Sequence, residues 1–389
     1  MFTARRVATL LFVTASVVGL VACGGQSSSN NTTGAAASNA PIVIGVTSEK
    51  TGPVPVLGAE AIGYAAAAKY INQHGGILGR KVKLVVHDNA GDASRAVSDL
   101  LAFHSQGINL VLGGAFGGDC QAEAPVAASL AMVAICGSTD NLDPAAPTNM
   151  FGVGPGYSPT IANTTSIISR YAKKAAVFAD RDASGNDSAT IGPADLKTHG
   201  VTPILIRTDP TATSLKASIQ QAMSKGAQVI WFSECTPAVI QGVSEAQQLG
   251  FKGKIMLENC LASFDVAKAL KGLAGTNKQL IIQVPQLLLN HTASDPQEAS
   301  AIALFKQTVP GQPNVVVAAG WDSMWVLKNA IEKAGSTDTA KVIAALNNNF
   351  HYTGVWQSGT YTSHDHRAAV TTGYTDPAYF TNSGGFGVL

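Results

Sequence analysis

Four cysteines in the body of the chain are the side chains whose chemistry is easiest to define. They are Cys120, Cys136, Cys235 and Cys260. In an exported chain an even number of cysteines favours disulfides, and four cysteines allow three pairings. Metal binding is the alternative use, but the sequence has no CxxC pair and no cysteine–histidine spacing of a zinc site. We therefore expect disulfides and no metal centre.

The other reactive side chains do not form a catalytic set. His364 and His366 flank Asp365 and could bind a metal, but no third ligand has a suitable spacing, so two exposed histidines are the expectation. The run Ser27–Ser29 lies in a polar segment, and the chain has neither a nucleophile-elbow motif nor a metalloprotease helix. We predict that the protein is not an enzyme and has no cofactor.

The fifth cysteine, Cys23, ends an N-terminal leader. Met1–Arg6 is positively charged, Val7–Val21 is apolar or small, and the run Leu20-Val21-Ala22-Cys23 is similar to a bacterial lipobox. Residues 1–22 are therefore predicted to be a signal peptide. Cys23 is predicted to carry the lipid that anchors the chain on the extracytoplasmic face of a cell membrane. A short transmembrane anchor is the alternative, but the apolar run is shorter than the roughly 20 residues that a spanning helix needs.

Composition limits what the rest of the chain can be. Residues 23–40 are rich in Gly, Ser, Asn and Ala, which predicts a flexible lipidated tether. The 389 residues are 46% hydrophobic and 13% charged, as in a globular chain long enough for two packed units. The net charge of +1 and the absence of a Lys/Arg cluster exclude a nucleic-acid binder.

After Pro41 short apolar runs alternate with amphipathic segments, which predicts parallel sheets with helices on both faces. In the first half the predicted strands are 42–46, 82–86, 110–112 and 132–135, and the predicted helices are 62–70, 93–103 and 121–128. In the second half the predicted strands are 175–178, 201–206, 229–232, 255–257 and 280–282, each but the last followed by a helix-like segment. The fold class is therefore α/β, with two Rossmann-like lobes.

Two local features fit this division. The Gly-rich run 152–156 falls between the two series and is predicted to be a hinge, since Pro155 interrupts any dinucleotide-binding pattern. The cysteines fall at the carboxyl ends of neighbouring strands, two in each lobe. Pairing Cys120 with Cys136 and Cys235 with Cys260 would brace these loops and leave the lobes free to move. Farther on, Asp322 begins an apolar segment and is predicted to cap its helix.

A series of short motifs runs through the chain in a fixed order. In this order and combination they resemble the leucine/isoleucine/valine-binding family of bacterial solute-binding proteins, from about Pro41 to Tyr361. The motifs are Ile44-Gly45-Val46, Thr51-Gly52-Pro53 with Gly58, Ala68 through Ile71-Asn72, Gly75 to Arg80, Asp88 with Gly91-Asp92, Val111 to Gly114, Ala124 to Ala127, and Gly320-Trp321-Asp322.

The resemblance implies the fold of a type I periplasmic binding protein. Two lobes would be joined by a hinge of three crossovers, and a small molecule would bind between them. On this basis lobe 1 is predicted at 41–155 plus 288–352, and lobe 2 at 156–287 plus 353–389. The implied partner is an ABC-type membrane permease, and a monomer suits a receptor whose two lobes close.

The resemblance also implies where the ligand binds in the first lobe. The loop that usually offers a serine hydroxyl and backbone groups to a ligand carboxylate corresponds to Phe116-Gly117-Gly118, where the hydroxyl is absent. The next family segment corresponds to Cys136 through Asp140, so Ser138 and Thr139 are candidate donors, whereas Asp140 would repel a carboxylate.

In the second lobe the implied ligand residues depart from the family pattern. Ser184 stands where an aromatic residue is usual, and another aromatic position falls near Cys235. The acidic residue that normally meets an α-ammonium falls at Asn259, with Glu258 beside it. These departures argue against an ordinary branched-chain amino acid.

The function predicted from the sequence is therefore a lipid-anchored, extracytoplasmic solute-binding protein. It would capture a small polar or amphipathic metabolite, such as an amino acid or a related compound, and deliver it to an ABC importer. The alternative is a ligand sensor that reports to a membrane receptor without transport, which an uncharged pocket would favour.

Overall fold

A computed structural model describes residues 40–138, 142, 149–154, 157–181, 183–274, 278–289, 295–356, 358–370 and 375–389. The predicted signal peptide, Cys23 and almost all of the predicted tether lie outside these residues. Within them, no helix combines the length and the apolar character needed to cross a bilayer.

The first sheet is built from five strands, all parallel, in the order β2-β1-β3-β4-β5. Its strands are β1 (Ile42–Ser48), β2 (Val82–Asp88), β3 (Leu110–Leu112), β4 (Val133–Cys136) and β5 (Met150–Gly152). Sequence analysis did not assign β5 as a strand, because it has three residues and ends in a glycine of the predicted hinge.

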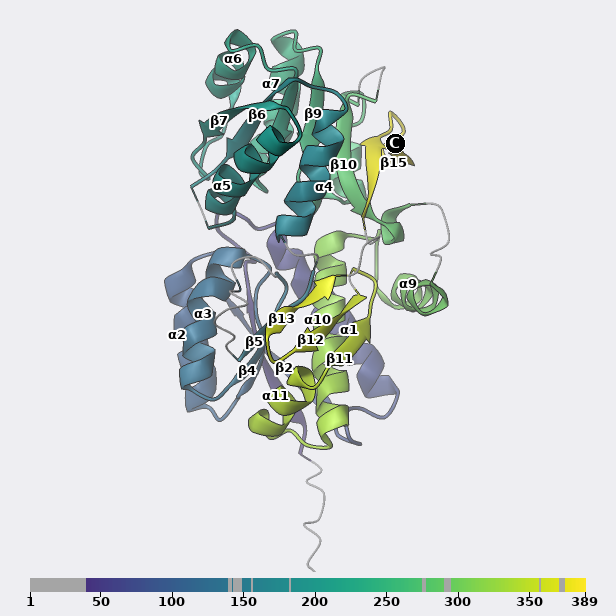
Figure 1. Ribbon diagram of the computed structural model, residues 1–389. Helices are drawn as coiled ribbons and strands as arrows, with labels where there is room; N and C mark the ends of the chain where they lie inside the picture. Colours follow the sequence, from purple (N-terminus) through teal and green to yellow (C-terminus); the bar gives the residue numbers. More distant parts are fainter. Residues whose placement is uncertain are drawn as a thin grey trace, which may run out of the picture. The chain divides into compact units, whose positions relative to one another are not determined.

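Both faces of the sheet are buried at β3, β4 and β5, which explains why these strands lack charged residues, whereas the edge strand β2 is partly exposed and contains Lys83, His87 and Asp88. In β4, Val133 and Ile135 join one core cluster, whereas Ala134 and Cys136 join another. The first cluster includes residues of α1 (Glu60–Gln73) and α10 (Val315–Ala334), which pack along each other (Figure 1). The second cluster includes residues of two helices on the opposite face, α2 (Ala93–Ser105) and α3 (Gly117–Ser129).

The second sheet follows the same construction. Its order is β15-β14-β10-β9-β8-β6-β7, and β14 alone runs antiparallel to its two neighbours, β10 and β15. The strands are β6 (Lys174–Ala179), β7 (Thr202–Arg207), β8 (Val229–Phe232), β9 (Lys254–Leu257), β10 (Leu280–Pro285), β14 (Thr375–Phe380) and β15 (Phe386–Val388).

Helices cover both faces of the second sheet as well. One core cluster joins apolar residues of its strands to α4 (Tyr157–Ser169) and α5 (Ala183–Thr198). Residues of the other face pack with α6 (Lys216–Ser224), α7 (Pro237–Gln248) and α8 (Phe264–Ala269). The remaining helices are α9 (Pro296–Thr308) and α11 (Thr339–Asn347), and short 3-10 turns cover Leu57–Ala59, Asn259–Leu261 and Gln286–Leu288. The predicted fold, α/β with parallel sheets flanked by helices, is confirmed.

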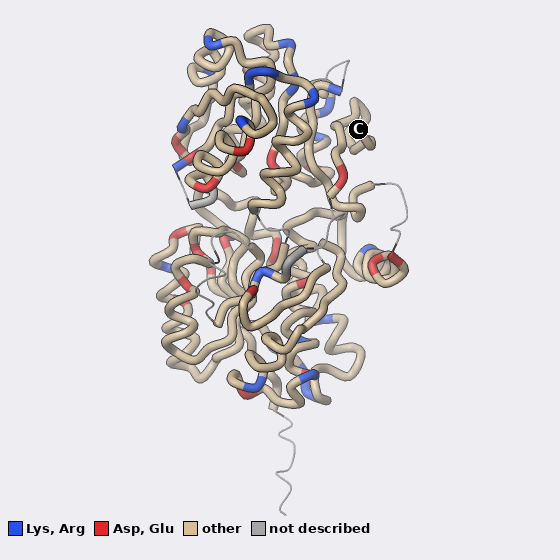
Figure 2. The backbone as a smooth tube through the Cα atoms, in the orientation of Figure 1, with Lys and Arg blue, Asp and Glu red and all other residues tan. Residues whose placement is uncertain are grey.

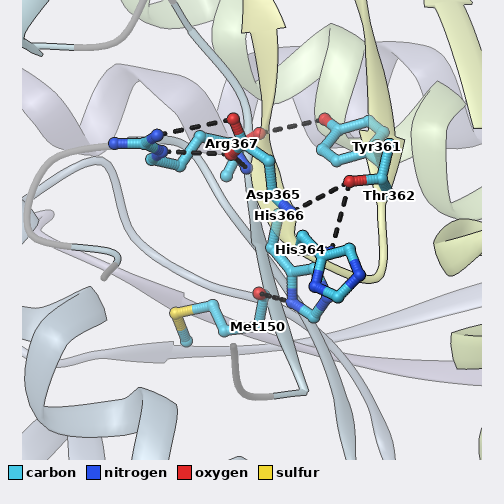
Figure 3. A network of polar contacts seen from close by, with 8 residues as sticks. Met150, Tyr361, Thr362, His364, Asp365, His366 and Arg367 are labelled. Atoms are coloured by element: carbon cyan, nitrogen blue, oxygen red, sulfur yellow. Dashed lines mark hydrogen bonds and ion pairs between the residues drawn. The ribbon is translucent and has the colours of Figure 1, made fainter. Parts of the chain in front are cut away.

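A third, antiparallel sheet consists of β11 (Phe350–Thr353), β12 (Ser358–Thr362) and β13 (Asp365–Val370). It is attached to β5 of the first sheet by the Tyr361 hydroxyl, which donates to the Gly152 carbonyl at 2.9 Å, and by a 3.2 Å contact between His366 Nδ1 and the Met150 carbonyl (Figure 3). The His366 ring also stacks on Phe151. The predicted lobe bounds stay a prediction, but these contacts join residues predicted for lobe 2 to a strand of the first sheet.

The two histidines near the C-terminus therefore differ. His364 is exposed as expected, but the expectation is wrong for His366, which the ring of Phe151 and the β5 backbone bury. Among the residues that the structure describes, no group of three or more His, Cys, Asp or Glu side chains is arranged to hold a metal ion.

Asp322 does not cap a helix, contrary to the sequence prediction. Asn314 caps α10, and Asp322 lies within this helix, fully buried. Its carboxylate accepts hydrogen bonds from the Tyr352 hydroxyl at 2.8 Å and from the Trp356 backbone N–H at 2.8 Å, and the Val355 N–H donates to both oxygens. These contacts join α10 to β11 and to the loop after it. Because both segments are distant from Asp322 in the sequence, the local sequence pattern could not identify the contacts.

Replacing Asp322 with Ala should destabilise the fold by roughly 2–4 kcal/mol, because two backbone N–H groups and a phenol hydroxyl lose their buried acceptor. Urea unfolding followed by tryptophan fluorescence measures the loss. Asp338, which caps the exposed start of α11, provides the control, since Asp338→Ala should cost only about 1 kcal/mol. Equal losses in the two variants would contradict this role of Asp322.

Candidate functional site

A pocket lies at the carboxyl ends of parallel strands from both central sheets. The loops that form it follow β1, β3, β4 and β5 of the first sheet and β6, β8 and β9 of the second. The start of α10 and the loop after β11 complete it. The lining residues are Val54, Leu57, Ala115, Phe116, Gly117, Gly137, Ser138, Val153, Gly154, Thr160, Asp180, Gly185, Ser233, Glu234, Cys235, Glu258, Asn259, Cys260, Val315, Val316, Ala319 and Trp356. Ligands of open α/β folds bind in such crevices.

The first-sheet side of the pocket is mostly apolar. Phe116 is the N-cap residue of α3, and Gly117 begins the helix, so backbone N–H groups of its first turn lie at the pocket. Ser138, which follows β4, contributes a hydroxyl group. Val315 and Val316 at the start of α10 add apolar surface.

The acidic side chains of the pocket lie on its second-sheet side. Asp180 follows β6, Glu234 follows β8 and Glu258 follows β9. The three side chains are buried, with 3% to 6% of their surface exposed. Burial raises the pKa of Glu258, because removal of water disfavours the charged form, although the backbone N–H of Asn259 opposes this effect. This side of the pocket is therefore acidic.

Two disulfides brace the loops around the pocket. Cys235 is bonded to Cys260, and both residues line the pocket on the loops after β8 and β9. Cys120 is bonded to Cys136, which joins the first turn of α3 to the end of β4. The Cα–Cα distance is 6.1 Å in both pairs. The structure thus has the within-lobe pairing that sequence analysis favoured over the two alternatives.

Four buried carboxyl groups lie behind the first-sheet side of the pocket. We call Glu49, Glu60, Asp119 and Glu123 the carboxyl cluster; each is 0% exposed. Glu49 accepts the backbone N–H groups of Ala115 and Phe116, at 3.4 and 3.2 Å, and so holds the loop that lines the pocket. Glu123 accepts the Thr47 hydroxyl at 3.0 Å.

Glycines make room for these carboxyl groups. A Cβ atom on Gly114 would lie 1.9 Å from Glu49 Oε1, and one on Gly137 would lie 2.6 Å from Glu60 Oε2. Any larger residue at these two positions would force the carboxyl groups to move. The glycines after β3 and β4 are therefore required by the cluster as well as by the pocket.

Among the described residues, no Lys, Arg or His side chain forms an ion pair with a carboxyl group of the cluster. Both Asp119 oxygens, Glu60 Oε1 and Glu123 Oε2 are buried without a hydrogen-bond partner among the described residues. Burial, followed by the nearby Glu49 carboxylate, raises the pKa of Asp119 to about 8. Burial likewise raises the pKa of Glu49, Glu60 and Glu123. The cluster thus retains protons at pH values where exposed carboxyls are ionised.

Comparison with known proteins identifies the family. The family model described as "Periplasmic binding protein" matches residues 41–376, which is most of the chain. The chain belongs to this family. Periplasmic binding proteins are extracytoplasmic solute-binding proteins rather than enzymes, in agreement with the predictions from the sequence.

Curated and solved relatives agree with this assignment. A "Leu/Ile/Val-binding protein homolog 3" from Brucella melitensis is 26% identical over 321 residues, covering 80% of this chain and 84% of the relative. A leucine-binding protein from Thermotoga maritima is 18% identical with a TM-score of 0.78, covering 90% of this chain and 97% of that chain. A fatty acid ABC transporter substrate-binding protein from Thermomonospora curvata is 18% identical with a TM-score of 0.75, covering 90% and 91%. The structural likenesses show the type I periplasmic binding protein fold.

The structure brings most of the sequence-predicted ligand residues to the pocket of this periplasmic binding protein. Phe116, Gly117, Ser138, Glu258 and Asn259 all line it. Thr139 and Asp140 lie outside the described residues. Ser184 is in the first turn of α5, next to the lining residue Gly185. Direct contact of these residues with a ligand stays a prediction.

Several lining residues were missed by sequence analysis. Asp180 comes one residue after the last paired residue of β6, and Glu234 comes two residues after that of β8, so their positions at strand ends could have marked them as candidates. Trp356 comes from the loop after β11, and its backbone N–H donates to Asp322. No local sequence signal marks that residue as part of a binding site.

The carboxyl cluster should make folding stability fall as the pH rises from about 5 to about 8. In this window the unfolded carboxyls, with ordinary pKa values of 3.8 to 4.5, are ionised while the folded cluster still binds protons. The folded state therefore binds more protons than the unfolded state, and each such group costs about 1.4 kcal/mol per pH unit. Glu298, with its pKa raised by burial to about 7, acts in the same direction. Urea unfolding at pH 5.5, 6.5 and 7.5 measures the slope.

Glu123→Gln should flatten this slope, because the amide does not titrate and its oxygen can still accept from Thr47. The matched control is Glu332→Gln on the surface of α10, whose carboxylate pairs with Lys328, and this change should leave the slope unaltered. A stability that rises with pH between 5.5 and 7.5 in the unsubstituted protein would contradict the role assigned to the cluster.

Proposed function

We propose that this periplasmic binding protein is a lipid-anchored receptor on the extracytoplasmic face of the cell membrane. It captures a small polar or amphipathic metabolite, an amino acid or a related compound, and delivers it to an ABC importer. The pocket at the strand ends of both central sheets carries this proposal. The names of the relatives, Leu/Ile/Val-binding and ABC transporter substrate-binding, support it.

The topology suits a receptor that closes around its ligand. The chain passes between the two central sheets after β5, after β10 and after β13. Each disulfide joins residues within one of the two sets of strand-end loops. A hinge motion could therefore bring the two sides of the pocket together over a solute, with ligand affinity for the closed form driving the motion.

The rival function is a sensor that reports a ligand to a membrane receptor without transport. An uncharged pocket would have favoured it, but three carboxyl groups line this pocket. We therefore retain transport as the proposed function.

The receptor proposal predicts that a specific solute raises the unfolding temperature. A form of the protein starting at Pro41 keeps the strands and helices described above and can be screened against amino acids, amides, amines and aromatic acids. A ligand present at 100 times its Kd should stabilise the protein by about 2.7 kcal/mol. Refolding from denaturant before the screen removes any solute that copurifies. No shift with any compound after this step would overturn the small-molecule receptor.

The anchoring proposal predicts that Cys23→Ser releases the protein from membranes. Without the thiol no lipid can be attached, so the full-length variant should move from the membrane fraction to the soluble fraction. Mass spectrometry of the N-terminal peptide should find acyl chains on Cys23 in the unsubstituted protein. Ser27→Ala is the control, because it changes the same segment and leaves the cysteine in place. A Cys23→Ser protein that stays in the membrane fraction would argue for a different anchor.

A further inference from the structure

The described lining of the pocket contains acidic side chains but no basic ones. Three of its lining residues, Asp180, Glu234 and Glu258, carry carboxyl groups. No Lys, Arg or His is among the described lining residues. Figure 2 shows Lys and Arg dispersed along the described trace rather than gathered in one stripe (Figure 2). Among the described lining residues, a solute in this pocket therefore meets acidic side chains and no side-chain cation.

The three acidic residues follow strands that are neighbours in the second sheet. They follow β6, β8 and β9, which lie side by side in the second sheet in the order β9-β8-β6. Phe178, Phe232 and Leu257 are in register across these strands, and each acid comes one or two residues later. Adjacent strands are about 4.8 Å apart, so the three acids follow neighbouring strands at one edge of the sheet, where all three line the pocket; we call them the row.

Neutral donors contact two of these acids. The Thr208 hydroxyl donates to Glu234 at 3.1 Å, and the Thr236 hydroxyl lies 3.5 Å from the same oxygen. The Asn259 N–H donates to Glu258 at 3.2 Å. Near the third acid, Arg207 donates to the backbone oxygen of Asp180 and to the Asn186 side chain. Arg207 does not line the pocket.

On the opposite side of the pocket, the described lining residues include no charged side chain. Apolar residues such as Phe116, Val315 and Trp356 dominate it, and the polar groups there are Ser138 and the backbone of the α3 N-terminus. A neutral zwitterion would place one ammonium group near three carboxyls. Burying the remaining carboxyls under an apolar solute would be costly unless they stay protonated.

We propose that the solute of this pocket carries a net positive charge, with its cationic group at the row formed by Asp180, Glu234 and Glu258 and its apolar part against Phe116, Val315 and Trp356. This inference rests on the proposed function, because it names the class of solute for the same pocket. An apolar amine or a basic amino acid satisfies it. A neutral aliphatic amino acid or a carboxylic acid does not.

Two matched pairs of compounds test the charge directly by isothermal titration calorimetry on the refolded protein. Leucine and 3-methylbutylamine differ by the carboxylate, and norleucine and lysine differ by one ammonium group. In each pair the second member is more positive by one charge at similar apolar size. We expect the more positive member to bind at least tenfold more tightly in one pair or both, and 4-methylpentanoate to bind more weakly than either amine.

The side-chain test uses Glu258→Gln. The matched control is Glu332→Gln, at an exposed position of α10. Glu258→Gln should reduce the preference for the more positive member by about tenfold, and the control should leave it unchanged. Glu234→Gln provides a second variant if the first does not fold. Tighter binding of leucine and norleucine than of their more positive partners would overturn the charge inference and leave the receptor standing. Binding of no compound in the wider screen would overturn both.

Discussion

Burial of both faces of the parallel sheets is the constraint on which the site depends. In β3, β4, β6 and β8 successive side chains alternate between two apolar clusters, so these strands have no face left for a polar group. Polar residues can then lie only where the strands end and the backbone leaves the sheet. All the parallel strands of one sheet end at the same edge, which collects such residues from distant parts of the chain.

The carboxyl cluster shows how this constraint extends behind the pocket. Glu49 follows β1 directly, as Glu258 follows β9, yet Glu49 is turned toward the backbone N–H groups of Ala115 and Phe116. Its carboxylate oxygens therefore accept hydrogen bonds from the loop that lines the pocket. Full burial raises the pKa values of Glu49 and Glu123, because removal of water disfavours their charged forms. The same residue type at equivalent strand ends thus supports the loop on one side and lines the pocket on the other.

Sequence reasoning recovered the parts of the structure that are periodic or local. Apolar runs placed the strands from β1 to β10, apart from β5, because strands buried on both faces are rich in apolar residues. Spacing relative to strand ends also favoured the cysteine pairing that the structure has. The family resemblance led to Phe116, Ser138 and Glu258, which the structure places at the pocket.

Contacts between distant segments were beyond that reasoning. His366 is buried because its ring stacks on Phe151, more than two hundred residues earlier in the chain. Asp322 is buried because the chain returns to α10 at Tyr352 and Trp356. Hydrophobic periodicity reveals neither interaction, because each one joins a single side chain to a loop or strand end of another element.

Helix α10 links these long-range contacts to the binding site. Its first turn contributes Val315 and Val316 to the pocket, and two turns later Asp322 holds the backbone of Val355 and Trp356. Trp356 lines the pocket, so one helix supplies part of the apolar surface and positions another part of it. Because the Asp322 carboxylate is fully buried, its hydrogen bonds are strong and geometrically restrictive. The apolar side of the pocket is therefore set by a polar interaction outside it, while the acidic side is set by the strands of the second sheet.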